Sequence, residues 1–322
     1  MTITGPSGVT PRLSIGFPNW SVTDPGDWDF LLDRARAADR GGIDRLALSD
    51  HVVFGENLEA YSDPSIGGRE GGRQPTGPDG IWLEPLTLLA VIGSHTSQIR
   101  LHTGILLAAL RRPIVLAKTA ATLDVLSRGR LELGVGVGWQ REEYDAAGLR
   151  FENRGAALDQ TLAVCQALWR DQAASYHGEG LDFDAIHCMP KPVQPNGVPL
   201  WVSGTVNRRV LARVVKFGSG WIPWGGDVDT VAESAAQVHE SLRAAGRTIE
   251  GFEITGFLNR AKNDRGALDL QATMAVVPAM VAAGVTDFRL NVSVPNRLDE
   301  ATETFREVAS AFRASVGRPL PS

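Results

Sequence analysis

Residues 98–139 read QIRLHTGILLAALRRPIVLAKTAATLDVLSRGRLELGVGVGW, and this stretch decides the fold. Residues 99–107 are nearly continuously apolar, which is typical of a strand buried on both faces. Apolar residues then recur at helical spacing after Pro113, which suits the first turn of a helix, and Gly129 can end that helix. Residues 131–137 return to a strand pattern. A strand, a helix and a strand without a hairpin turn predict a right-handed parallel βαβ unit.

The same alternation continues through the rest of the chain. Further strands are expected over residues 12–17, 43–49, 200–203, 220–223, 252–258 and 287–292. Further helices are expected over residues 27–41, with Asp27 as the cap, 84–96, 142–144, 153–169, 207–217, 229–245, 270–283 and 299–316. About eight strands alternating with about eight helices predict one (β/α)8 TIM barrel domain over residues 1–322. A doubly wound open sheet is the alternative, because alternation does not show closure.

Two segments do not fit the alternation and are expected to be insertions. Residues 52–83 are rich in Gly, Pro, Asp and Arg and also carry Tyr61 and Trp82. A loop of this length in a compact domain is usually functional or disordered, so we expect it to set the substrate. From about residue 171 to 198, apolar and polar residues alternate around Gly178 and Gly180. This pattern predicts a small hairpin excursion.

Composition narrows the class of protein. The chain has 322 residues, 43% hydrophobic and 21% charged, and a net charge of -5 without a basic run, so nucleic acid and anionic membranes are not expected partners. Cys165 and Cys188 provide neither a disulfide framework nor a metal quartet, and His95, His177, His187 and His239 have no ligand-like spacing. No long apolar run and no secretion signal are present, so a cytoplasmic protein is expected.

In a barrel of this kind the active site lies at the carboxyl ends of the strands. Asp50 and His51 follow the strand predicted over residues 43–49, beside the long insertion. A single histidine is often structural, but one in this place can serve as a general acid or base or bind a cofactor ring. Ser203, Gly204 and Thr205 precede a helix, where they could bind a phosphate or simply cap the helix.

Glycines alternate at the end of the strand predicted over residues 131–137. Gly134, Gly136 and Gly138 would lie on one side of it, as close approach of a ligand requires, and as crowded barrel strands also require. The pattern is not the dinucleotide fingerprint, and the chain has no nucleophile elbow. A bound cofactor is therefore expected to carry the reaction.

Several segments read together form one recognisable pattern. They are Ser49-Asp50-His51, Thr103-Gly104, Arg112-Pro113 through Ala117-Lys118, Ala121-Thr122-Leu123-Asp124 through Ser127-Arg128-Gly129-Arg130, Leu133 through Trp139 with Glu142-Glu143, Arg154, Pro190 through Val193, and Gly220-Trp221. On these segments the chain resembles the luciferase-like flavin- and deazaflavin-dependent oxidoreductases, from about residue 12 to 225 and more faintly beyond.

The resemblance implies a barrel whose cofactor ring lies over the strand ends, with a non-prolyl cis peptide often found just after Thr103-Gly104. It fits the coenzyme F420 branch best, in which an Asp-His pair ends the second strand. Asp50 and His51 would then be catalytic, and His51 would face the reacting carbon. The residues expected to bind the cofactor are Thr103, Gly104, Gly136, Gly138, Trp139, Ser203, Gly204 and Thr205, the last three at its phosphate.

Two departures from the family pattern limit the substrate. The sugar-phosphate dehydrogenases of the F420 branch carry a glutamate where this chain has Trp139, which argues against that reaction. The usual Asp-Gly-Trp is Ser219-Gly220-Trp221 here.

Three hypotheses follow: an F420-dependent oxidoreductase acting on a small organic substrate, an FMN-dependent monooxygenase that uses oxygen, or a non-catalytic flavin carrier. A homodimer is also expected, because the family commonly pairs barrels and the predicted outer helices include apolar stretches such as residues 114–116.

Overall fold

The computed structural model describes residues 2–319, and its centre is a closed parallel barrel. In order of pairing, the strands are β1 (Arg12–Phe17), β12 (Asp287–Leu290), β11 (Glu253–Phe257), β10 (Gly220–Ile222), β9 (Leu200–Ser203), β6 (Leu131–Val135), β5 (Arg100–Leu106) and β3 (Arg45–Leu48). Because β1 pairs with both β12 and β3, the sheet closes on itself. The predicted barrel is confirmed, and the open-sheet alternative is wrong.

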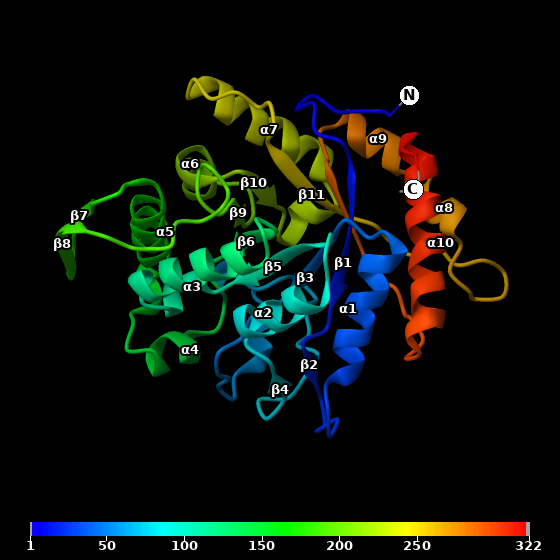
Figure 1. Cartoon of the computed structure of the whole chain (residues 1–322), viewed down its shortest axis with the longest axis horizontal. Coiled ribbons are helices and arrows are strands. Elements are labelled where there is room, and N and C mark those ends of the chain that lie inside the picture. Colours follow the sequence, from blue (N-terminus) through cyan, green and yellow to red (C-terminus); the bar gives the residue numbers. More distant parts are fainter. Residues whose placement is uncertain (1, 320–322) are drawn as a thin grey trace.

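Helices form the outer layer around the strands (Figure 1). They are α1 (Asp29–Gly41), α2 (Pro85–His95), α3 (Pro113–Leu126), α4 (Arg141–Ala146), α5 (Arg154–Arg170), α6 (Arg208–Phe217), α7 (Val231–Ala244), α8 (Leu270–Met274), α9 (Val277–Ala282) and α10 (Leu298–Val316). Short 3-10 helices connect some of them: η1 (Leu58–Ser62), η2 (Pro64–Ile66), η3 (Ala108–Leu110), η4 (Phe151–Asn153) and η5 (Gly225–Val228). Apolar side chains of the strands and helices fill the space between the two layers.

Two predicted helices differ from the structure. The helix expected over residues 270–283 is split into α8 and α9, because Pro278 lies in the first turn of α9 and has no N–H for a helical bond to the preceding turn. Trp28 rather than Asp27 precedes α1 as its cap residue. The Asp27 carboxylate instead accepts a hydrogen bond of 3.2 Å from the Asp29 amide.

The barrel interior is charged at its amino-terminal half. Arg45 is fully buried, and its guanidinium donates to Glu132 and to Asp287 at 2.5 Å each and lies 3.3 Å from Glu253. It also lies over the Trp201 ring, 4.5 Å from the centroid. Buried charges are tolerated only when they are paired in this way, and these ion pairs join β3 to β6, β11 and β12 across the barrel interior.

Two small sheets lie outside the barrel. β2 (Trp20–Ser21) pairs with β4 (Ile81–Trp82), which ties the end of the long insertion to the segment after β1, at the lower edge of Figure 1. β7 (Ala174–Gly178) pairs with β8 (Leu181–Ile186), as the predicted hairpin excursion requires, and lies at the left edge of that view. Among residues 2–319, no helix is both long and apolar enough to cross a membrane.

Candidate active site

Two adjoining cavities open at the carboxyl ends of the barrel strands. The histidine cavity, of about 430 Å³, includes His51, Tyr61, Trp82 and Trp139 in its wall. The arginine cavity, of about 750 Å³, includes Arg34, Arg260 and Arg289. The residues common to both walls are Trp20, Ser49, Gly104, Ile105, Ser203 and Trp224. These volumes are in the range that proteins use to enclose small molecules.

Nearly all of the predicted site residues meet at the histidine cavity. Its wall includes Asp50, His51, Gly104, Gly136, Gly138, Trp139, Ser203, Gly204 and Thr205. Thr103 is different, because its side chain is fully buried inside the barrel and its hydroxyl donates to the Gly134 carbonyl at 2.8 Å. The structure therefore gives Thr103 a strand-to-strand contact in the place of the predicted cofactor contact.

His51 follows β3 and is held on one side by Glu143 of α4. Its Nδ1 lies 3.2 Å from Glu143 Oε2, and Glu143 Oε1 accepts the Val52 amide at 2.9 Å. Both side chains are almost fully buried, at 9% and 1% exposed. A carboxylate anchored in this way favours the tautomer in which Nδ1 carries the proton. Nε2 is then the acceptor, and the Gln74 amide nitrogen lies 3.5 Å from it as a donor.

The Asp50 carboxylate is occupied by contacts with the segment after β5. Its carboxylate accepts the Leu107 amide at 2.8 Å and two hydrogen bonds from Arg111, at 2.6 and 3.1 Å. Arg111 also donates to Glu84 at 2.8 Å, and Glu84 is the cap residue of α2, so the ion pair is connected to this helix. Both Asp50 oxygens are therefore engaged in fixing the segment after β5, which makes Asp50 a positioning residue in this arrangement.

The peptide bond between Gly104 and Ile105 is cis. A non-prolyl cis peptide after the Thr103-Gly104 segment is the feature that the family resemblance implies, so this expectation is confirmed. Both residues line both cavities, and the pairing of β5 with β6 changes register between Thr103 and Leu106.

The alternating glycines face β5. A Cβ on Gly136 would lie 2.9 Å from Ile105 Cδ1, and one on Gly138 would lie 2.7 Å from Leu107 Cδ2. A Cβ on Gly134 would meet the carbonyl oxygen of Thr103. Residues 103, 105 and 107 alternate in step with the glycines, so the glycines allow the two neighbouring segments to approach closely. Of the two interpretations of this run, the geometry favours strand packing, although Gly136 and Gly138 also line the histidine cavity.

The segment predicted to bind phosphate is partly occupied by contacts within the protein. Asn207 caps α6 by accepting the amides of Arg209 and Val210, so neither Ser203 nor Thr205 is the cap. The Gly204 amide donates to Ile222, and the Thr205 hydroxyl donates to Trp224, at 3.2 and 3.0 Å. The Ser203 side chain lines both cavities.

Two residues of the cavity wall, Tyr61 and Trp82, were not predicted as site residues from the sequence. Tyr61 and Trp82 come from the insertion, and Trp224 follows β10 and donates from its indole to Gly67 and Gly68, at 3.0 and 3.1 Å. These contacts fasten the insertion over the cavity, where we expected it to set the substrate. Glu143 belongs to a segment that carries the family resemblance, and that segment was the only signal for it in the sequence.

The residues present fit a planar aromatic cofactor. The ring of Trp139 lies 5.9 Å from that of His51 and 5.2 Å from that of Tyr61. Its indole Nε1 is buried and has no hydrogen-bond partner within residues 2–319. Buried indole N–H groups normally have partners, and an acceptor on a bound molecule would supply the one that is missing here.

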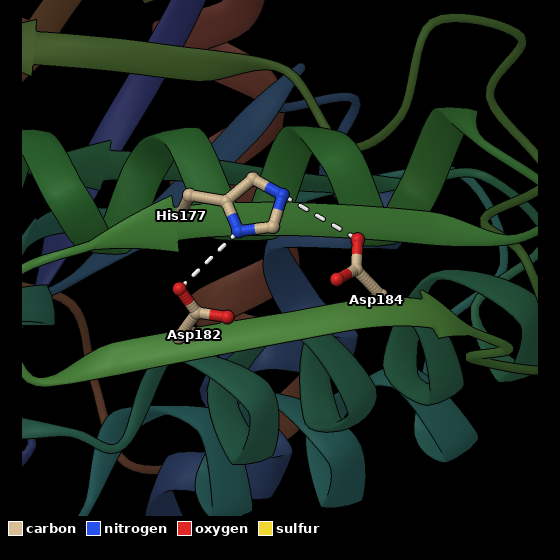
Figure 2. A group of neighbouring side chains, drawn as sticks. All are labelled: His177, Asp182 and Asp184. Atoms are coloured by element: carbon tan, nitrogen blue, oxygen red, sulfur yellow. Dashed lines mark hydrogen bonds and ion pairs between the residues drawn. The ribbon is translucent and has the colours of Figure 1, made fainter.

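A second group of polar side chains lies on the β7–β8 hairpin (Figure 2), and none of its residues lines either cavity. His177 Nδ1 lies 3.2 Å from Asp182 Oδ2, and its Nε2 lies 3.4 Å from Asp184 Oδ1. All three are exposed, and the Asp182 hydrogen bond together with the charge of Asp184 raises the pKa of His177. The spacing of His177 along the sequence is not ligand-like, and it is the pairing of β7 with β8 that brings His177 next to these carboxylates.

Comparison with known proteins agrees with this geometry. The model of the family described as luciferase-like monooxygenase matches residues 13–265. An uncharacterized protein of Mycobacterium tuberculosis is 36% identical over 165 residues, which span 51% of this chain and 58% of that relative. The F420-dependent glucose-6-phosphate dehydrogenase of Kineococcus radiotolerans is 27% identical over 79% of this chain and 70% of its own length.

A solved structure shares the fold over nearly the whole chain. An F420-dependent secondary alcohol dehydrogenase in complex with an F420-acetone adduct superposes with a TM-score of 0.72 and 18% identity, covering 94% of this chain and 99% of its own. The barrel, the cis peptide beside the cavities and a family match over most of the sequence lead to one conclusion: the chain belongs to the luciferase-like monooxygenase family.

Proposed function

We propose that this protein is a coenzyme F420-dependent oxidoreductase that moves a hydride between the deazaflavin and a small organic substrate. The observation that carries the proposal is His51, which lines the cavity at the end of β3 with its Nδ1 held by Glu143. The relative from Kineococcus radiotolerans supports the choice of cofactor, because its name states F420 dependence. Asp50, Gly104, Gly136, Gly138, Trp139, Ser203, Gly204 and Thr205 are the proposed positioning and cofactor-binding residues.

His51, the aromatic wall of the histidine cavity and the neighbouring Glu143 each have a definite chemical use in this proposal. The deazaflavin, when bound, accepts or donates the hydride. His51 accepts a proton at Nε2 from a substrate hydroxyl, or returns it in the reverse direction, while the carboxylate of Glu143 stabilises the imidazolium. Tyr61, Trp82 and Trp139 exclude water from the reacting groups.

Direct titration distinguishes the possible cofactors. The purified protein is titrated with F420 and, separately, with FMN, while the absorbance of the ring and tryptophan fluorescence are followed. Trp20, Trp139 and Trp224 line the histidine cavity, so binding of a flat chromophore there should quench emission. Mass spectrometry on protein made in a host that produces F420 identifies the cofactor that is retained. Saturable F420 binding supports the proposal, and binding of FMN alone refutes it.

Replacement of His51 tests the role of the side chain. His51→Ala should lower turnover by about 10² or more under saturating cofactor, as expected for loss of an acid–base group. His177→Ala is the matched control, because this histidine is exposed on the hairpin. Equal turnover in both variants would remove His51 from the mechanism. Cofactor binding without turnover in any donor or acceptor screen would instead favour a carrier protein.

An FMN-dependent monooxygenase is the second candidate. The family model that matches residues 13–265 is described as a luciferase-like monooxygenase, which favours this reaction independently of the two F420-dependent proteins. Reduced FMN consumed together with oxygen, in the presence of an organic substrate, would establish it. Reduced F420 that is stable in air but oxidised by an added acceptor would favour the hydride transfer.

We also propose a homodimer that pairs through α3. Ile114, Val115 and Leu126 of this helix are 42%, 62% and 71% exposed. Apolar side chains on an outer helix would be covered in an isologous interface. Light scattering across a wide range of concentrations should give twice the chain mass, and a constant mass of one chain would contradict the proposal.

A further inference from the structure

The arginine cavity differs from the histidine cavity in the charge of its wall. Among the described residues that line it, Arg34, Arg260 and Arg289 are charged, and there is no aspartate or glutamate. The remainder of the wall is mainly apolar, including Phe17, Ile222, Phe257, Val292, Val294 and Phe305. A cavity that combines guanidinium groups with apolar surface fits a molecule with one anionic end and one apolar end.

Arg289 is the deepest of the three arginines. It lies in β12 with its side chain 7% exposed, and its guanidinium is 5.6 Å from the centroid of the Phe257 ring. Its Nη1 lies 2.5 Å from the place that a Cβ on Gly104 would occupy. The guanidinium is therefore directed to the carboxyl end of β5, against a residue that both cavities share.

The one carboxylate next to Arg289 is largely committed to other partners. Asp287 Oδ1 accepts from Arg45 at 2.5 Å, and its Oδ2 accepts from Ser14 and Thr255 at 3.1 and 3.0 Å. Arg289 Nη2 lies 3.7 Å from that Oδ2, beyond hydrogen-bonding distance. Within the part of the chain that the structure describes, this buried Nη2 has no hydrogen-bond partner.

Arg289 also stays a cation inside the barrel. Burial lowers the pKa of Arg289, yet a guanidinium keeps its proton in proteins. A buried guanidinium nitrogen that has no hydrogen-bond partner among residues 2–319 is costly, and a bound anion would supply that partner.

We propose that the arginine cavity binds the carboxylate of the substrate, with Arg289 as the buried contact and Arg260 and Arg34 at the rim, so that the substrate is an organic acid with an apolar body. This inference rests on the proposed function, because it names the substrate class for the same pair of cavities. The shared Gly104-Ile105 wall would place the apolar body beside the histidine cavity.

The test compares an anion with its neutral isostere. Benzoate and benzamide are titrated into the F420-loaded protein and into the cofactor-free protein, with the tryptophan fluorescence of Trp20 and Trp224 as the signal. We expect the wild-type protein to bind benzoate about tenfold or more tightly than benzamide, as a charge-assisted hydrogen bond from a buried guanidinium requires. Equal binding of the two compounds overturns the proposal.

Substitutions of single arginines locate the source of the preference. Arg289→Met should bring the ratio of the two affinities close to one, and Arg260→Gln should lower it about threefold or more. Arg40→Gln is the matched control, because Arg40 is exposed at the opposite end of the barrel and should leave the ratio unchanged. If Arg289→Met does not fold, Arg260→Gln and Arg34→Gln decide the matter, and an unchanged ratio in both overturns the proposal.

One further experiment shows whether the arginine cavity binds the substrate or the acidic tail of the cofactor. F420 itself carries anionic groups, so the affinity for F420 is measured in each variant and in the presence of benzoate. Binding of benzoate together with F420, and an F420 affinity unchanged by Arg260→Gln, support the proposal. Competition between the two assigns the arginines to the cofactor and overturns it. Failure of F420 and FMN to bind at all would refute the proposed function, while the anion preference of the cofactor-free protein would still be measured.

Discussion

Gly138 tests whether the close approach of β5 and β6 explains the glycine run. In the structure its φ is +70°, and a Cβ there would lie 2.7 Å from Leu107 Cδ2. An alanine at this position therefore has two costs. The left-handed backbone costs an L residue roughly 1–2 kcal/mol, and overpacking against a buried side chain adds about 1–3 kcal/mol. Gly138→Ala should thus lower the free energy of unfolding by about 2–5 kcal/mol.

Gly148 provides the matched control. It has the same φ of +70°, but a Cβ there would meet no atom within 4 Å. Gly148→Ala should therefore have only the backbone cost of roughly 1–2 kcal/mol. Gly136→Ala tests the overpacking cost alone, because its φ is not in the left-handed region. Its Cβ would lie 2.9 Å from the movable end of Ile105.

The assay is guanidinium unfolding of the cofactor-free protein, followed by an F420 titration of the same preparations. The difference in unfolding free energy between Gly138→Ala and Gly148→Ala isolates the contact with Leu107. Equal losses in these two variants, within about 0.5 kcal/mol, would refute the packing argument. Weaker F420 binding by Gly138→Ala without that difference in stability would show that the ring, and not β5, requires the glycine.

Three further predictions concern titratable groups. Glu143→Gln should lower turnover about 10-fold or more, because the amide would no longer hold the His51 ring by charge, and unchanged turnover would exclude that role. Burial lowers the pKa of His102 to about 4, so the unfolded chain binds a proton that the folded protein does not, and stability should fall by about 3 kcal/mol as the pH drops from 6.5 to 4. The His102→Gln variant should lack this loss of stability between pH 6.5 and 4. If its unfolding free energy depended on pH as that of the wild type does, the prediction would be contradicted. The raised pKa of His177 means that its contacts favour folding at low pH and weaken as the pH rises through that pKa, so NMR titration should place the pKa above 6.5 and Asp182→Asn should lower it.

The sequence predicted local elements well because they depend on neighbours in the chain. The limits of β1 and β9 are the predicted ones, and α3 begins at Pro113 as expected. Barrel closure could not be predicted from alternation, since it depends on pairing between β1 and β12 at opposite ends of the chain. Pro278 was overlooked as a breaker, because the apolar spacing around it continues through both short helices.

At the candidate site, too, the sequence predicted what depends on neighbours in the chain but not what depends on distant residues. The position of His51 after a strand was enough to place it at the cavity, but its partner Glu143 is 92 residues away along the chain. Asp50 was placed correctly beside it, yet its engagement with Arg111 depends on a contact 61 residues away. Arg289 has no motif around it, so only the packed barrel reveals that its carboxylate neighbour is already occupied.

Closure of the barrel by its first and last strands has a consequence for synthesis of the protein. On the ribosome, β1 can pair with β3 early, but its other edge has no partner until β12 has emerged, some 270 residues later. At about 5–20 residues per second this takes roughly 14–55 seconds. Unpaired strand edges recruit strands from other chains during such an interval. Slower translation should therefore increase aggregation of this chain, and chaperones that bind exposed strand edges should raise its yield.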